Sequence, residues 1–193
     1  MTSNYELVGF PAIPGKILIL GNSVAFGSME KGFFYVDDGN DFWQILDMAF
    51  YPGKSVFEKL RVDFKKGNEQ ERVAIKQRFI ELLNANDIGL SDVISKCINE
   101  TRSKDPTIKK ETIEYNNQLP SLIDNCEVII INGYTDTYSN FRKALNKYSI
   151  DISSKKLFVV GSSANYRGMT NEKRGLRGLE WAKALCWYRE NKK

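Results

Sequence analysis

The chain has 193 residues, 42% of them hydrophobic and 27% charged, with a formal net charge of +4. This balance is typical of one globular domain, 1–193, with a substantial core, and it favours a polyanionic partner only mildly. Histidine is absent, and Cys97, Cys126 and Cys186 form no C-x-x-C pair. We therefore expect no metal site, no imidazole catalysis and no side chain that titrates near neutral pH.

The N-terminus has no signal-peptide pattern, and no apolar run reaches the roughly 18 residues that span a bilayer. We therefore expect a cytoplasmic protein that is not embedded in a membrane. Residues 1–15 carry two prolines and no periodic pattern, so we expect an N-terminal arm there.

Apolar runs and amphipathic patterns then alternate along the chain. Continuous apolar runs predict buried strands over residues 16–20, 88–94, 127–131 and 157–160. Apolar residues at spacings of three and four predict helices over residues 40–50, 55–66, 69–83, 119–125, 135–148 and 172–189. The last helix should turn Leu179, Ala182, Leu185 and Cys186 inward, and the polar segment 99–112 should be a surface loop.

This alternation predicts an α/β fold, a three-layer α/β/α sandwich around a mainly parallel sheet of four strands. Ligands bind at the carboxyl ends of the strands in such folds. Those ends carry small or polar residues, namely Gly21-Asn22-Ser23, Ser91-Asp92, Asn132-Gly133 and Gly161-Ser162-Ser163.

The connection after the first strand, residues 21–39, is much longer than the roughly two to six residues usual between a strand and a helix, which indicates a binding or catalytic loop. It is no P-loop, because Phe26 precedes Gly27 and a serine follows it. The dinucleotide-binding pattern and the nucleophile elbow are also absent. Amides, hydroxyls, carboxylates and aromatic rings are left to form a site.

Several short motifs follow one another along the chain, and their order is informative. They are GNSVAFGS from residue 21, GFFY from 32, NDFW from 40, IGLSDVI from 88, LPSLI from 119, IIING from 129 and SSAN from 162. Together they resemble the uracil-DNA glycosylase superfamily, above all its mismatch-specific and hypoxanthine (deoxyinosine) branches. The resemblance implies a base excision repair enzyme that acts on DNA, and we expect a monomer. Such an enzyme flips a deaminated nucleotide out of DNA and hydrolyses the bond between base and deoxyribose, without a metal or cofactor.

The resemblance also implies roles for single residues. Asn40 would be catalytic, and the ring of Tyr35 would stack on the extruded base. The residues implied to bind the base are Asn22, Ser23, Phe33, Tyr35, Asp92 and Asn132. The second motif is implied to press the DNA backbone and to fill the vacated stack, with Ser162, Ser163, Asn165, Tyr166 and Arg167 on DNA. The following helix carries Lys173, Arg174 and Arg177 near its start, where we expect positive charge to face phosphate. The family's two prolines and small hydroxyl residue at these motifs are replaced by Val24, Ala25 and Ser163.

The residues themselves leave alternatives open. Asn40 can simply cap a helix, Asp37, Asp38 and Asp41 can be a general base or solvated turn residues, and either Phe33 or Tyr35 can belong to the core. The chain could also be a non-catalytic DNA-binding module, or a nucleoside or nucleotide hydrolase that uses the same pocket.

Overall fold

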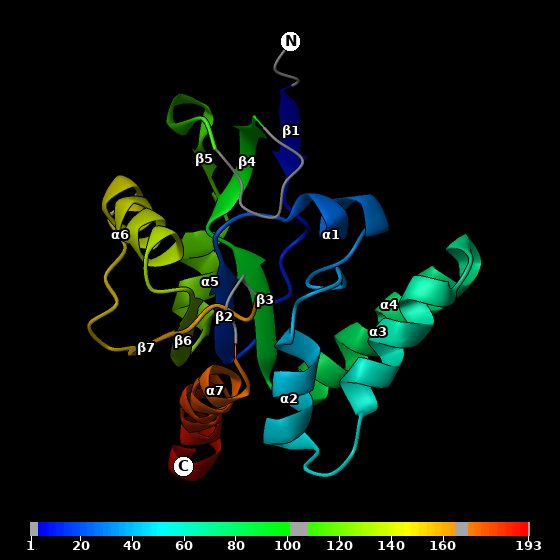
Figure 1. Cartoon of the computed structure of the whole chain (residues 1–193). Helices are drawn as coiled ribbons and strands as arrows, with labels where there is room; N and C mark the ends of the chain where they lie inside the picture. Colours follow the sequence, from blue (N-terminus) through cyan, green and yellow to red (C-terminus); the bar gives the residue numbers. More distant parts are fainter. Residues whose placement is uncertain (1–3, 101–107, 165–169, 193) are drawn as a thin grey trace.

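The central sheet consists of four parallel strands in the order β3-β2-β6-β7 (Figure 1). The computed structural model describes residues 4–100, 108–164 and 170–192. The strands are β2 (Ile17–Gly21), β3 (Ile88–Asp92), β6 (Val128–Asn132) and β7 (Lys156–Val160). Ile17 of β2 lies opposite Ile88 on one side and Val128 on the other. All residues of β2, β3 and β6 are buried, as expected for strands covered on both faces.

Helices cover both faces of this sheet, and alternate residues of β2 show how. Ile17 and Ile19 pack in the core beneath α2 (Phe42–Phe50), α3 (Val56–Lys66), α4 (Glu69–Ala85) and α7 (Asn171–Asn191). Leu18 and Leu20 point the other way, into the core beneath α5 (Leu119–Asn125) and α6 (Asp136–Tyr148). The predicted three-layer α/β/α sandwich is therefore confirmed.

A second sheet of three antiparallel strands, in the order β1-β4-β5, lies beyond the carboxyl end of β3 (Figure 1). It contains β1 (Tyr5–Val8), β4 (Ile94–Asn99) and β5 (Glu114–Tyr115), with a single 3-10 turn, η1 (Lys110–Thr112), before β5. The expected N-terminal arm is thus partly a strand, and the predicted strand 88–94 ends at Asp92. These strand pairings join distant parts of the chain, such as Tyr5 with Asn99, so no local sequence pattern predicts them.

Two further details differ from the sequence-based expectations. The long connection contains a short helix, α1 (Phe26–Lys31), whose six residues bury only Ser28 and so give no apolar periodicity. Leu179 of α7 is 68% exposed, although Leu185 is buried as expected. Cys97 and Cys126 are buried, and Cys186 is partly buried. Within the described parts of the chain, no helix combines the length and apolarity needed to cross a membrane.

Candidate active site

A cavity of about 680 Å³ opens at the carboxyl ends of the parallel strands. Three strand ends supply its base, through the last residues of β2, β3 and β6, which are Gly21, Asp92 and Asn132. The segment 34–40 and the segment 162–164 form further parts of its wall. The four polar strand ends predicted from the sequence therefore meet at one place, and among the predicted base-binding residues Asn22, Ser23, Tyr35, Asp92 and Asn132 all line it.

Asn40 lies in the cavity wall just before α2. Its Oδ1 accepts the backbone N–H of Phe42 at 3.0 Å, so the side chain does cap the helix. Within the described residues no hydrogen bond engages its Nδ2. The cap fixes the orientation of the carboxamide, and one lone pair of Oδ1 and both N–H groups remain available to a ligand.

The loop after β7 is fastened to the loop that carries Asn40. The Asp41 N–H donates to the Ser163 carbonyl at 3.0 Å, and Asn40 pairs with Ala164 in an isolated antiparallel bridge. Asn132 holds the same loop from below, since its Oδ1 accepts the Ser163 N–H at 2.8 Å and its Nδ2 donates to Ser163 Oγ at 2.9 Å. The Asn132 amide thus holds the Ser163 loop through both of its polar atoms, and the same amide also acts on the Tyr35 hydroxyl, where it lowers the pKa that burial raises. These bonds reduce what Asn132 can offer to a base.

The predicted DNA-contact loop is only partly described. Ser163 is fully buried and holds the loop to the sheet, whereas Ser162 and Ala164 beside it are exposed. The hydroxyl available on this loop surface is therefore that of Ser162, not that of Ser163. Asn165, Tyr166 and Arg167 lie outside the described residues.

Arg177 of α7 joins both loops from one side. Its guanidinium donates to the Ser162 carbonyl at 3.0 Å and the Ala164 carbonyl at 3.1 Å, and it also donates to the Asp41 carboxylate. The side chain is 6% exposed, so our expectation that Arg177 faces phosphate is wrong. We call these contacts of Arg177 with Ser162, Ala164 and Asp41 the Arg177 clamp. The sequence pattern around Arg177 does not predict it, because Asp41 lies far away in the sequence.

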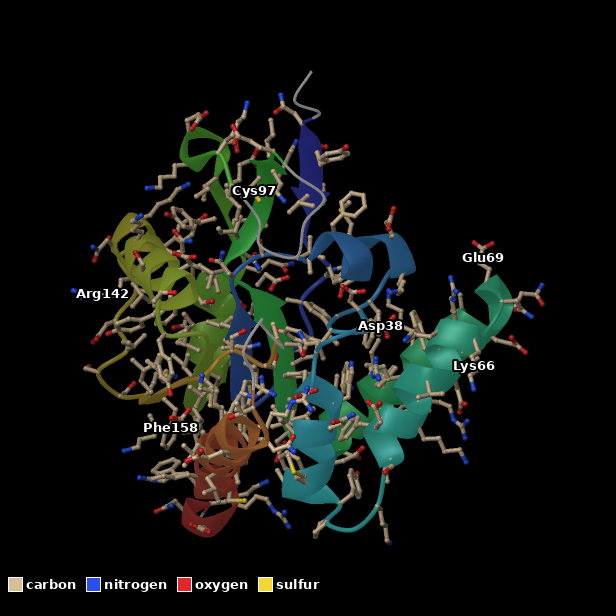
Figure 2. All side chains as sticks on the ribbon, in the orientation of Figure 1. Asp38, Lys66, Glu69, Cys97, Arg142 and Phe158 are labelled. Atoms are coloured by element: carbon tan, nitrogen blue, oxygen red, sulfur yellow. The ribbon has the colours of Figure 1, made fainter. Side chains whose placement is uncertain are left out.

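The three acidic residues of the long loop are each held by a cation. Asp37 pairs with Lys31 at 2.9 Å, and Asp41 pairs with Arg177. Asp38 pairs with Lys65, and this hydrogen bond lowers the pKa of Asp38 below its ordinary value. Figure 2 shows Asp38 in the connection between α1 and α2, on the side of α3. A carboxylate whose pKa is lowered in this way is a poor proton acceptor, so the arrangement argues against Asp38 as a general base.

The aromatic residues 33–35 divide between core and cavity. Phe33 is 1% exposed and packs on Trp43 and Phe79, with ring centroids 6.0 and 5.2 Å away. It does not line the cavity, so its predicted contact with the base is wrong; Phe34 lines the wall instead. Adjacent aromatic residues in a turn point to different sides, and the sequence does not show which of them faces the cavity.

Tyr35 has an unusual backbone, with a φ of 52° in the left-handed region that non-glycine residues rarely adopt. Its ring stacks on Phe42 at a centroid distance of 4.1 Å, and its hydroxyl lies buried in the cavity floor. Burial, and then the nearby Asp92 carboxylate, raise the pKa of Tyr35 well above its ordinary value. The hydroxyl therefore stays protonated, and strain of this kind is commonly kept at functional sites.

Asp92 is the second buried polar group in the cavity. It is 6% exposed, and burial raises the pKa of Asp92 to about 7. The expectation that no side chain titrates near neutral pH is therefore wrong, because it considered only histidine. Asn22 lies nearby in the same wall, where its Oδ1 accepts the Asn140 Nδ2–H at 2.9 Å. Asn140 was not foreseen, since it comes from the middle of α6.

The described residues contain no group of three or more cysteine, aspartate or glutamate side chains that could hold a metal ion. What the cavity offers is hydrogen bonding. It presents an oriented carboxamide, a buried hydroxyl, a buried carboxyl and an aromatic wall, which suit a flat, polar, ring-shaped ligand.

Comparisons with known proteins agree on one group. The chain is 29% identical over 181 residues to a protein named hypoxanthine DNA glycosylase from Methanosarcina barkeri, and the match covers 92% of this chain and 96% of the relative. A protein of the same name from Methanosarcina acetivorans is 29% identical over 128 residues, which cover 65% of this chain and 70% of the relative. The solution NMR structure of a candidate uracil DNA glycosylase from Methanosarcina acetivorans superposes with a TM-score of 0.62 at 25% identity, over 96% of this chain and 99% of that one. No protein-family model matches the chain.

Proposed function

These comparisons confirm the resemblance to the uracil-DNA glycosylase superfamily and its hypoxanthine branch, and on that premise we propose that the chain is a monofunctional DNA glycosylase for deaminated bases. It hydrolyses the N-glycosidic bond of hypoxanthine or uracil in DNA after the nucleotide has been flipped out of the stack. It works inside the cell, in the cytoplasm, as a monomer, and needs neither metal nor cofactor.

The orientation of Asn40 is the observation that carries this proposal. The Phe42 N–H fixes Oδ1 of this cavity-lining residue, and no hydrogen bond engages Nδ2 among the described residues. A carboxamide held in this way can accept a hydrogen bond from water through Oδ1 and donate one to the departing base through Nδ2. Preorganised groups of this kind stabilise charge that develops in the transition state.

The remaining steps of the reaction need few further protein groups. As the bond between the base and C1′ breaks, its electron pair leaves with the base, and the sugar becomes an oxocarbenium ion. Water then attacks C1′, and the proton that it loses is balanced by the one that the anionic base finally takes up. Asp37 and Asp38 also line the cavity, each paired with a lysine, and we assign neither of them a proton-transfer role.

The Arg177 clamp supports the same proposal through geometry. It holds the loop of Ser162 and Ala164 against the loop of Asn40, so a DNA backbone pressed by the first loop would place its flipped nucleotide beside the second. Ser162 and the undescribed residues Asn165, Tyr166 and Arg167 remain the proposed DNA contacts. Arg174, which is half exposed, is the better candidate for phosphate on α7.

A panel of oligonucleotides tests the function directly. Each carries one hypoxanthine, uracil, adenine or cytosine, in single- and double-stranded form, and alkaline cleavage reports abasic sites under single-turnover conditions. We expect cleavage only at hypoxanthine or uracil. Binding without cleavage of any strand would identify a non-catalytic DNA-binding module. Hydrolysis of free deoxyinosine or its nucleotide, with intact oligonucleotides, would identify a small-molecule hydrolase.

A further inference from the structure

Tyr134 is an exposed aromatic residue shortly after β6. It is 52% exposed, and it is the one aromatic ring among the large hydrophobic side chains that are exposed in the described parts of the chain. It does not line the cavity. A single exposed apolar residue needs no explanation by itself, but the contacts of this one hold it in a particular place.

Glu180 of α7 fixes the ring although the ring is exposed. The Tyr134 hydroxyl donates to Oε2 of Glu180, and the same oxygen accepts the Gly161 N–H at 3.1 Å. Partial burial and then the hydrogen bond to Glu180 raise the pKa of Tyr134 to about 12, so the hydroxyl keeps its proton and keeps donating at neutral pH. A ligand that binds this ring therefore does not have to immobilise it, which favours binding.

The ring lies beside the loop that follows β7. A Cβ atom at Gly161 would lie 3.7 Å from Tyr134 Cε2, so the ring lies against the backbone just before Ser162. The same glycine is held from α7, because Trp181 Nε1 donates to its carbonyl at 2.8 Å. The exposed Ser162 is a proposed DNA contact, and a strand that touches it passes next to Tyr134.

Gly133 directs the chain from the cavity to this place. Its φ of 129° favours glycine, and a Cβ atom there would lie 2.9 Å from Thr137 Oγ1. The Gly133 N–H donates to the Val160 carbonyl at 3.0 Å, so the chain leaves β6 toward the end of β7. Asn132 thus lies in the cavity base, and Tyr134 lies outside the cavity.

The neighbouring charge shows which part of DNA suits the ring. The Tyr134 hydroxyl is already bonded, and the Glu180 carboxylate beside it repels phosphate. The ring itself remains for a ligand, and aromatic rings hold unpaired bases by stacking, whatever the base sequence. A base therefore suits Tyr134 better than the DNA backbone does.

We propose, on the basis of the proposed glycosylase function, that Tyr134 is a stacking platform for the base next to the flipped nucleotide on the same strand. The loop of Ser162 contacts the backbone between the two nucleotides. The flipped base enters the cavity on one side of this loop, and its neighbour stacks on Tyr134 on the other side. Stacking on a side chain requires an unpaired base, so the platform acts mainly on single-stranded DNA.

The first test measures binding apart from cleavage. The probe is a labelled single strand with one 2′-fluoro-deoxyinosine, whose fluorine disfavours the cationic sugar, so the strand stays uncut, and fluorescence anisotropy gives its Kd. Tyr134→Ala should raise this Kd about tenfold, whereas Tyr134→Phe keeps the ring and should raise it less than about threefold. Val73→Ala, which removes an exposed apolar side chain of α4 outside the cavity, is the matched control and should bind as the parent.

Excision of ordinary deoxyinosine at saturating enzyme should change less than about twofold in Tyr134→Ala, because the contact lies outside the cavity. Thermal melting of each variant separates lost folding from lost binding.

The second test removes the neighbouring base. Two further probes carry a stable abasic analogue on the 5′ or the 3′ side of the fluorinated nucleotide. For one of them the parent should bind about tenfold more weakly, and Tyr134→Ala should add no further loss, since the ring and the base form one contact. With a paired probe, where the neighbouring base keeps its partner, Tyr134→Ala should raise Kd less than about threefold.

The two hypotheses fail differently. If the parent binds single strands through Tyr134 but cuts no deaminated base, the glycosylase proposal is lost and the platform stands as part of a DNA-binding module. If Tyr134→Ala binds as the parent does, or loses equal affinity with and without each neighbouring base, the platform is overturned while excision by the parent still supports the glycosylase. Equal losses in Tyr134→Phe and Tyr134→Ala would also overturn it, because they would assign the effect to the hydroxyl.

Discussion

Replacing Asp92 by asparagine should make folding stability less dependent on pH, because the carboxyl is buried and forms no ion pair within the described part of the chain. Burial raises its pKa from 3.8 to about 7. Between these values the folded chain binds a proton that the unfolded chain has released, so the free energy of unfolding falls as pH rises. The asparagine variant carries no such proton and avoids this loss.

The magnitude follows from the size of the shift. One pKa unit corresponds to about 1.4 kcal/mol, and from pH 5 to pH 8 this carboxyl should cost the parent roughly 2 to 3 kcal/mol that the variant keeps. The amide of the variant is itself buried without a ready partner, which adds an offset at every pH. The change with pH, and not the stability at one pH, is therefore the quantity to compare.

Urea unfolding at pH 5, 6, 7 and 8 measures this change, and Asp47→Asn is the control. Asp47 is equally buried, but its carboxylate accepts the N–H groups of Val56, Phe57 and Glu58 at 2.8 to 2.9 Å. Asp47→Asn should therefore lower stability by about 1.5 to 3 kcal/mol through the loss of this acceptor. Burial raises the pKa of Asp47 as well, so the pH dependence that Asp47 contributes has the same sign as that of Asp92. A constant difference between Asp92→Asn and the parent from pH 5 to pH 8 would refute the reasoning.

Three further outcomes are expected. Arg177→Met should lower the free energy of unfolding by about 3 kcal/mol and the excision rate by at least about tenfold, because the Asp41 carboxylate and two carbonyls lose their buried partner. Arg174→Met removes a half-exposed contact and should lower the free energy of unfolding by under about 1 kcal/mol. Equal losses of stability in the two variants would contradict the role given to Arg177. Gly21→Ala should abolish base excision, since its Cβ would meet the Asp92 carboxylate at 2.3 Å, and full activity of a folded Gly21→Ala protein would contradict the close approach. Excision should survive EDTA, and loss that zinc or magnesium restores would mean that a metal takes part.

The buried half of this fold was readable from the sequence because it depends on local pattern. The run Ile17 to Leu20 is apolar at every position, and only a strand covered on both faces needs that. The missed elements depend on distant partners instead. β1 buries a single residue, Leu7, and exists because it pairs with β4. α1 is too short to show a helical period.

The residues of the candidate site also differ in whether a local sequence pattern predicts them. Asn22, Asp92 and Asn132 could be predicted because polar residues at the carboxyl ends of parallel strands converge. Arg177 could not, since an arginine near the start of a surface helix is normally solvated, and only the fold brings Asp41 to it. The neutral pKa of Asp92 was also hidden, because it arises from burial that the sequence does not display.

The catalytic role of Asn40 is the centre of this account, and the single-turnover excision rate of Asn40→Ala tests it most directly. The assay uses whichever of the hypoxanthine and uracil oligonucleotides the parent cuts, with thermal melting to follow the lost cap, which should cost only about 1 kcal/mol. Asn117→Ala, an exposed asparagine outside the cavity, is the control and should match the parent. We predict that Asn40→Ala stays folded and that its excision rate falls by a factor of about 100 or more, the scale of losing one preorganised polar group. A folded Asn40→Ala protein that cuts at the parent's rate would contradict the account.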